Sequence, residues 1–186
     1  MRFLPALLLW LIAIPAWSQN DLVLPNVDFS ATAVQEVGAF MTRETIRYSQ
    51  GKLRIERGQG FSTTILDLNT RTECVLMVNH TYLVLPMNDG QYKRYVARGV
   101  AVTGATKRGT ERVDGLVTTK YAFGEAGGTN PEGFYWLADN GIMVRREYVD
   151  GLFGQNEHHR EFLTGITLQK QPAALFVIPS GYKPAT

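Results

Sequence analysis

From about Val27 onward, the chain consists of short runs rich in β-branched and aromatic residues, separated by turn residues. The turns recur about every 8 to 12 positions, a spacing typical of an antiparallel sandwich or barrel. Residues 52–57 show the pattern most clearly, because Leu53 and Ile55 alternate with charged residues as in a half-buried strand. The sequence therefore predicts a mostly β domain built of antiparallel strands.

Further strands are predicted wherever such a run is bounded by turn residues. They cover residues 41–49, 61–68, 73–78, 81–85, 116–123, 134–137, 142–149 and 159–169. Asp139-Asn140-Gly141 marks the clearest hairpin turn. Helix is scarce: residues 89–102 are the best candidate, residues 172–176 predict a helical turn with proline at its start, and residues 27–37 fit either a first strand or a short helix.

Two of these strands, at residues 73–78 and 81–85, are apolar on both faces. Both faces of such a strand must be covered. A helix, a second sheet or a bound apolar ligand can each cover one face. Residues 134–137 show the same property, with Phe134 and Trp136 sharing one face. Ordinary core packing and a ligand-accepting cavity both account for these side chains, since apolar residues line most binding pockets. The candidate ligand-binding residues are Val75, Met77, Leu83, Leu85, Phe134 and Trp136.

Residues 1–18 have the features of a secretory signal peptide. Arg2 supplies positive charge, residues 3–17 form an apolar run, and Ala16-Trp17-Ser18 places small residues where a signal peptidase reads the chain. We expect cleavage after Ser18, which leaves residues 19–186 as a single domain in the periplasm. The apolar run is shorter than the roughly 20 residues that span a bilayer, so no membrane-spanning segment is predicted.

Charge and cysteine content narrow the classes of partner. The chain has 19 basic and 17 acidic residues, and removal of Arg2 with the signal peptide brings the two closer to balance. Because nucleic-acid binding needs a clustered basic excess, no nucleic-acid partner is expected. The single cysteine, Cys74, rules out an intramolecular disulfide, and its apolar strand favours a buried thiol over a reactive one.

The sequence pattern contains no recognisable catalytic, metal or cofactor motif. Of the three histidines, His158 and His159 are adjacent, so on a strand they point to opposite faces and cannot easily bind one ion. Neither Ser62 nor Ser180 lies in a Gly-x-Ser-x-Gly motif. The glycines at 124–128 lack the lysine and the helix of a phosphate-binding loop. We therefore expect a protein that is not an enzyme and that holds no cofactor.

A series of short motifs follows one another along most of the mature chain. They are Gly-Lys-Leu-Arg-Ile-Glu at 51–56, Thr-Ile-Leu-Asp-Leu at 64–68, Tyr-Leu-Val-Leu-Pro-Met at 82–87, Gly-Thr-Glu-Arg-Val-Asp-Gly at 109–115 with Thr-Lys-Tyr at 119–121, Phe-Tyr-Trp-Leu-Ala-Asp-Asn-Gly-Ile at 134–142, and the segment 172–182 that ends in Pro-Ser-Gly-Tyr. In this order they resemble the lipoprotein-localisation factor (LolA/LolB-like) superfamily. No single motif identifies a residue that contacts lipid.

The resemblance implies a mostly β (α+β) fold, a curved antiparallel half-open barrel sheet with a few short helices as a lid over an apolar cavity. The hypothesis that follows is a periplasmic binding protein or chaperone for a lipid or another apolar ligand, such as lipoprotein acyl chains. The alternative is a non-enzymatic adaptor or subunit of a cell-envelope complex, whose protein partner covers the apolar sheet. An enzyme ranks last, because no acid–base pair is recognisable.

Overall fold

The structure, a computed structural model, describes residues 24–89, 91–92, 105–124, 132–150 and 157–185. These residues form one twelve-stranded sheet. The sheet is open, with β12 and β7 as its two edge strands. In chain order the strands are β1 (Phe29–Val37), β2 (Phe40–Ser49), β3 (Lys52–Arg57), β4 (Ser62–Asp67), β5 (Thr72–Leu76), β6 (Thr81–Pro86), β7 (Thr106–Val113), β8 (Leu116–Phe123), β9 (Glu132–Ala138), β10 (Met143–Asp150), β11 (Glu157–Leu168) and β12 (Lys183–Pro184).

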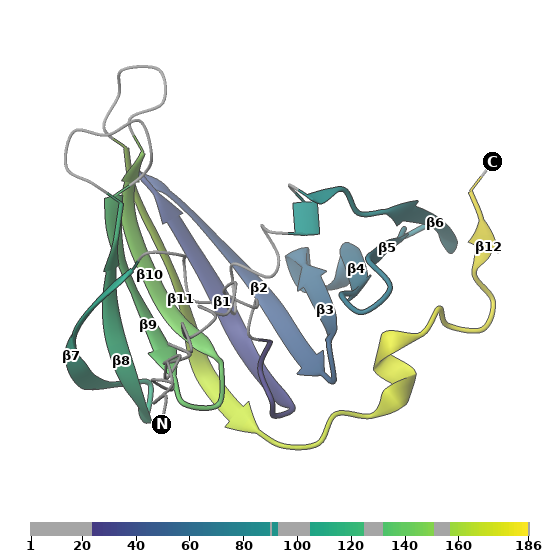
Figure 1. The fold of residues 1–186 in the computed structure, drawn as a ribbon. Helices are drawn as coiled ribbons and strands as arrows, with labels where there is room; N and C mark the ends of the chain where they lie inside the picture. Colours follow the sequence, from purple (N-terminus) through teal and green to yellow (C-terminus); the bar gives the residue numbers. More distant parts are fainter. Residues whose placement is uncertain (1–23, 90, 93–104, 125–131, 151–156, 186) are drawn as a thin grey trace, which may run out of the picture.

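The strand order across the sheet is β12-β6-β5-β4-β3-β2-β1-β11-β10-β9-β8-β7. Every neighbouring pair is antiparallel except β12 and β6, which run parallel. Strands that are consecutive in the chain lie side by side within two meanders, β1 to β6 and β7 to β11, and the pairing of β1 with β11 joins them. Figure 1 shows the long strands β7 to β11, β1 and β2 side by side, with β3 to β6 turning away from them. The mostly β class and the curved open sheet are confirmed.

Most strands lie where alternation predicted them. β3 and β8 have the predicted bounds, and residues 27–37, which fitted a strand or a helix, contain β1. Of the predicted helix at 89–102, Asp89, Gln91 and Tyr92 are helical and most of the remainder lies outside the described residues. The predicted signal peptide also lies outside them. Within the part of the chain that is described, no helix is long and apolar enough to cross a bilayer.

Two short 3-10 helices complete the described elements, η1 (Gly58–Gly60) and η3 (Ala173–Phe176). The predicted helical turn at 172–176 is thus confirmed, with Pro172 as its N-terminal cap residue. The segment after β11 carries η3 past β3 towards β6, where β12 joins the sheet (Figure 1). Phe176 of η3 packs against Ile65 and Leu76 in a small cluster of its own.

Candidate apolar-ligand site

One face of the sheet carries the main hydrophobic core, and the strand register identifies its side chains. Residues opposite each other on antiparallel strands share a face. One row runs from Tyr48 through Leu53, Leu66 and Glu73 to Leu85, from β2 to β6. The core cluster of the protein contains the first three of these residues, and Leu24, Val27 and Tyr92 pack against it. We call this face the inner face and the opposite one the outer face.

The neighbouring row on the inner face changes from buried to exposed along its length. It runs from Ile46 through Ile55, Thr64 and Val75 to Leu83. The Ile55 side chain is 0% exposed, whereas Leu83 is 43% exposed and Leu85 beside it is 40% exposed. The rest of this face is hydrophobic core, so leucines that are about two-fifths exposed on it offer a surface for an apolar partner. At β5 and β6 the inner face therefore continues as an open strip of Val75, Leu83 and Leu85, with Glu73 between Leu66 and Leu85.

A cavity of about 60 Å³ lies on the inner face near β1 and β2. Its apolar lining includes Phe29, Ala33, Ile46, Tyr48, Leu53 and Leu68, and its polar lining includes Glu44, Arg146 and Glu161. Pockets for drug-sized ligands measure roughly 300 to 1,000 Å³. An alkyl chain therefore needs side chains or segments over the inner face to move before it enters this cavity.

The wall of this cavity is fixed by a hydrogen bond at the β2–β3 turn. The Gly51 backbone N–H donates to the Tyr48 Oη over 2.9 Å, and the Tyr48 ring stacks on Phe29 with a centroid distance of 5.6 Å. Burial raises the pKa of the Tyr48 hydroxyl above its ordinary value, although the Gly51 hydrogen bond opposes the shift. Tyr48 thus stays neutral and presents an aromatic surface to the cavity.

The structure divides the predicted ligand-binding residues between two places. Val75, Leu83 and Leu85 lie together on the inner face, and Met77 follows β5 directly. Phe134 and Trp136 lie on β9, near the other edge of the sheet. These six side chains therefore do not line one cavity, and none of them borders the 60 Å³ cavity. Phe134 borders a separate open recess of about 670 Å³.

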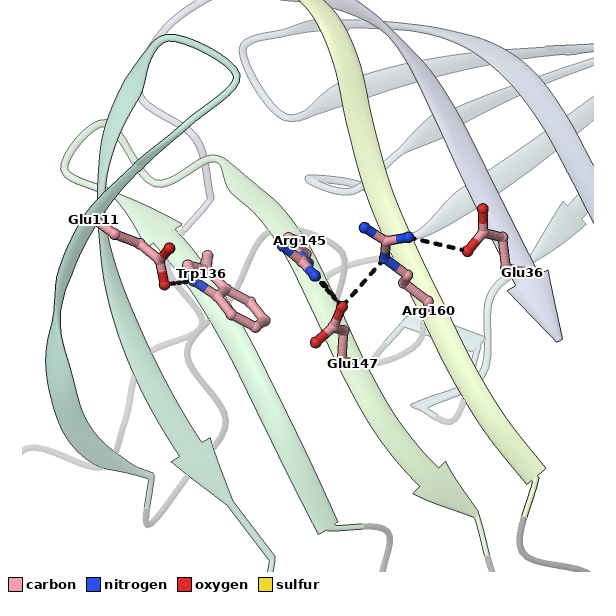
Figure 2. A network of polar contacts seen from close by, with 6 residues as sticks. All are labelled: Glu36, Glu111, Trp136, Arg145, Glu147 and Arg160. Atoms are coloured by element: carbon pink, nitrogen blue, oxygen red, sulfur yellow. Dashed lines mark hydrogen bonds and ion pairs between the residues drawn. The ribbon is translucent and has the colours of Figure 1, made fainter. Parts of the chain in front are cut away.

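Trp136 lies on the outer face, in the row that joins Lys120, Trp136 and Arg145. Its indole N–H donates to a Glu111 carboxylate oxygen over 2.6 Å. The Lys120 ammonium lies 4.7 Å and the Arg145 guanidinium 4.8 Å from the indole ring centroid. Figure 2 shows the Trp136 ring beside Glu111 and Arg145. Charged side chains therefore cover this tryptophan, which is 3% exposed, so its fluorescence reports on the outer face.

A chain of ion pairs continues from Arg145 across the outer face (Figure 2). Arg145 donates to Glu147, and Arg160 Nε lies 3.2 Å from the same carboxylate. Arg160 also contacts Glu36 over 3.4 Å. Because cations and carboxylates alternate along this chain, the outer face here is polar and largely compensated in charge. This part of the outer face is thus polar, unlike the apolar core on the inner face of β2 to β4.

Glu56 is the centre of a second ion-pair group on the outer face. Its two oxygens lie 2.7 Å from Arg47 Nη1 and 2.7 Å from Arg54 Nε. Burial raises the pKa of the Glu56 carboxyl, but the hydrogen bonds from the two arginines outweigh this effect, and the pKa lies below its ordinary value. A lowered pKa in the folded state means that ionised Glu56 stabilises the fold above the unfolded pKa and loses this effect as pH falls through the folded pKa.

Replacing Glu56 by glutamine is expected to reduce the free energy of unfolding by about 1 kcal/mol at pH 7, the upper range for a partly screened ion pair. The difference between the two proteins should shrink as pH falls below about 4.3, where the unfolded carboxyl protonates. Urea unfolding at pH 7 and at pH 3 measures it. The control is Glu157→Gln, since the exposed Glu157 side chain forms no ion pair among the described residues. If Glu56→Gln is destabilised as much at pH 3 as at pH 7, ionised Glu56 is not the source of the stabilisation.

Two of the histidines and the cysteine lie beside aromatic side chains. His159 stacks on Tyr148 with a centroid distance of 4.6 Å, and His80 lies 5.3 Å from the Tyr182 ring. In the described part of the chain, no group of three histidine, cysteine or acidic residues is placed to hold a metal. Cys74 is half-buried beside the Phe176 cluster, and burial raises the pKa of its thiol.

Most residues around the cavity were missed by sequence reasoning. Every second residue of β1 from Phe29 to Ala33 faces inward. This two-residue period was hard to recognise, because Val34 also is apolar and residues 27–37 have a helix-like composition. Ile46 and Tyr48 also alternate within β2. The detectable signal is the alternation that these residues share with Leu53 and Ile55 on the next strand.

Comparison with known proteins supports the fold. No protein-family model and no curated protein sequence matches this chain. Among solved structures, an uncharacterised conserved protein from Thermus thermophilus is 12% identical with a TM-score of 0.54, over 86% of this chain and 90% of that chain. A likeness at this identity concerns the fold alone.

Two other solved structures are more distant in shape. A chain of the MucA/MucB complex from Pseudomonas aeruginosa is 18% identical with a TM-score of 0.47, over 80% of this chain and 54% of that chain. LolA superfamily protein NE2245 from Nitrosomonas europaea is 12% identical with a TM-score of 0.41, over 84% of this chain and 92% of that chain. A LolA superfamily protein is thus among the solved structures similar to this chain.

Proposed function

We propose that this protein binds a lipid or another apolar ligand on its inner face and acts as a non-enzymatic carrier or chaperone. In this proposal residues 1–18 direct export and residues 19–186 work in the periplasm. The observation that carries it is the apolar strip of half-buried Val75 with exposed Leu83 and Leu85, which continues the buried core to β6. An alkyl chain laid along this strip removes apolar surface from water, at about 25 cal/mol per Å².

The difference between the faces supports this position for the ligand. The outer face carries ion pairs at Glu147 and Glu56, and η3 covers it beside β5 through Phe176. At β6 two inner-face leucines, Leu83 and Leu85, stay exposed, against one large apolar side chain on the outer face, Val84. The small cavity at Tyr48 and Leu53 lies on the same face. It offers a second apolar contact if the ligand displaces Leu24 and Pro25, which also line the cavity.

Strand β6 provides a matched pair of variants for the test. Leu83→Asp with Leu85→Asp places charge on the inner face, whereas Val84→Asp places it on the outer face of the same strand, where Val84 is 49% exposed. We expect the double variant to bind an anthroyloxy-labelled fatty acid at least roughly tenfold more weakly, because two leucine contacts are lost. Val84→Asp should bind like the unmodified protein.

The purified protein should also carry lipid that mass spectrometry detects after extraction. Absence of co-purifying lipid together with no binding of the labelled fatty acid would exclude the proposal. Equal weakening by Val84→Asp and by the inner-face variant would show that the inner face is not the binding surface. Thermal unfolding of each variant checks that the fold persists.

The exposure of Val84 together with Leu83 and Leu85 favours a second candidate, an adaptor whose protein partner covers β6. Apolar side chains exposed on both faces of one strand fit a partner that wraps the sheet edge. In this case Val84→Asp weakens partner binding as much as the inner-face variant does. Size-exclusion chromatography of an envelope extract distinguishes the two candidates, because the adaptor elutes with a stoichiometric partner and the carrier with lipid.

A further inference from the structure

Exposed apolar side chains gather at one end of the sheet. The three most exposed large apolar residues of the described chain are Phe40 at 81%, Phe61 at 73% and Val78 at 60%. Phe40 belongs to the β1–β2 turn region, Phe61 to the β3–β4 turn and Val78 to the β5–β6 turn. In an antiparallel meander alternate turns lie at the same end of the sheet. These three turns therefore lie at the same end of their strands, and the β1–β2 turn stands beyond the β3–β4 turn, because β2 pairs with β3 only from Glu44 onward.

The turns at the opposite end have the reverse chemistry. They contain Gln50-Gly51, Asn69-Thr70-Arg71, Asp114-Gly115 and Asp139-Asn140-Gly141. None of these residues is apolar apart from glycine, and the nearby Leu68 is buried at 4% exposure. Polar turns are the ordinary solution for hairpins in water. The phenylalanines at the first end therefore depart from what hairpin turns require.

The β1–β2 hairpin carries its tip beyond the neighbouring strand. β2 pairs with β3 from Glu44 to Ser49 only, so Phe40 and Met41 have no partner in β3. Gly38 turns the chain with a φ of +56°, and a Cβ there would meet nothing within 4 Å. Met41 is 53% exposed beside Phe40. We name Phe40, Met41, Phe61 and Val78 the apolar rim.

The turns that carry the apolar rim have no acidic residue. The turn sequences 38–43, 58–61 and 77–80 contain neither aspartate nor glutamate, and Glu36, which lies opposite Met41, contacts Arg160 over 3.4 Å. Arg43 is exposed, and its side chain contacts the Met41 sulfur over 3.6 Å. An arginine beside aromatic and methionine side chains suits the phosphate layer of a bilayer, where cations meet headgroups and apolar tips enter the acyl boundary.

We infer that the apolar rim docks the protein on a lipid surface. The side chains stand on separate hairpin tips, so each enters a fluid bilayer independently. A protein partner, in contrast, needs a continuous contact of about 1,000 Å² or more with fitted shape. The rim lies at the strand ends and leaves the inner face open, so docking and binding of an apolar ligand use different residues. The inference stands without the proposed ligand function.

Co-sedimentation with vesicles of phosphatidylethanolamine and phosphatidylglycerol tests the inference. Phe40→Ser with Phe61→Ser is expected to lower the partition coefficient at least roughly tenfold, because two aromatic side chains no longer enter the bilayer. The matched control is Leu168→Ser with Val177→Ser, which removes apolar side chains of 49% and 53% exposure away from the rim. The control should partition like the unmodified protein. Arg43→Gln should weaken binding to these vesicles and leave binding to phosphatidylcholine vesicles unchanged.

Other outcomes overturn the inference. No sedimentation of the unmodified protein with vesicles, or equal loss in the rim and control variants, removes the lipid surface as partner. A dimer in sedimentation velocity that the rim variant dissociates, without vesicle binding, assigns the rim to contact between copies. The inner-face variant Leu83→Asp with Leu85→Asp should still sediment with vesicles. If this variant loses vesicle binding, the unmodified protein binds vesicles by taking up lipid on its inner face and not through the apolar rim.

Discussion

Replacing Gly133 by alanine is expected to lower the free energy of unfolding by about 3 kcal/mol, near the upper range for overpacking. Gly133 on β9 faces Tyr148 of β10. A Cβ at this position would lie 2.0 Å from the Glu147 carbonyl oxygen and 2.6 Å from the Tyr148 Cα. Both are backbone atoms, so no side-chain rotation relieves the clash and the two strands must separate.

The strand pair at Gly133 also holds an aromatic stack on the inner face. Tyr148 stacks on His159 with an interplanar angle of 7°, and the Arg146 guanidinium lies 4.3 Å from the Tyr148 ring centroid. Displacement of Tyr148 should therefore change the near-ultraviolet circular dichroism as well as the unfolding midpoint in urea. A lower midpoint together with a changed near-ultraviolet spectrum is the result expected if β9 and β10 separate.

Gly165→Ala is the control for this substitution. Gly165 has a φ of +63°, and a Cβ there would meet nothing within 4 Å. Its replacement costs only the strain of a left-handed backbone, about 1 kcal/mol. If Gly133→Ala loses no more stability than Gly165→Ala, the close approach of β9 and β10 does not exist in solution.

Replacing Phe176 by alanine is expected to cost about 3 kcal/mol, the lower range for a buried phenylalanine. Phe176 is 7% exposed and packs against Ile65 and Leu76 on the outer face. In the segment around it, Leu175 and Tyr182 pack on the same cluster, and Arg54 Nη1 donates a hydrogen bond to the Leu175 carbonyl over 3.0 Å. Removal of the ring should release the segment from the sheet.

Hydrogen exchange distinguishes this local release from a general loss of stability. The Lys183 amide donates to the His80 carbonyl over 3.0 Å, and the Ala185 amide donates to the Tyr82 carbonyl over 2.8 Å. Both amides should exchange faster in Phe176→Ala than in the unmodified protein. Val177→Ala, at a side chain that is 53% exposed, should leave stability within about 0.5 kcal/mol. Unchanged exchange at Lys183 and Ala185 would show that β12 holds its place without Phe176.

The strands could be predicted because their signal is local. The charges that alternate with Leu53 and Ile55 make β3 readable, and β8 has the predicted bounds for the same reason. β1 was ambiguous because its inward residues include two alanines, Ala31 and Ala33, which are small and fit helices well. The hairpin between β9 and β10 was readable from Asn140 and Gly141, which suit a tight turn.

The candidate site was only partly predictable, because alternation assigns residues to a face without saying what covers that face. Phe134 and Trp136 share a face as predicted, but Lys120 and Arg145 from neighbouring strands cover Trp136. The strands at 73–78 and 81–85 needed cover on both sides. Their outer face receives Phe176 from a segment about a hundred positions later in the chain, whereas Leu83 and Leu85 on the inner face stay exposed.

The sequence by itself determined the strand positions, the turns and the separation of each strand into two faces, since these depend on neighbours one to four positions apart. Only the tertiary structure decided what covers each face, where β1 meets β11, and which apolar side chains stay in water. Those outcomes depend on contacts between residues far apart in the chain, such as Ile65 with Phe176. No local pattern encodes the distance between them.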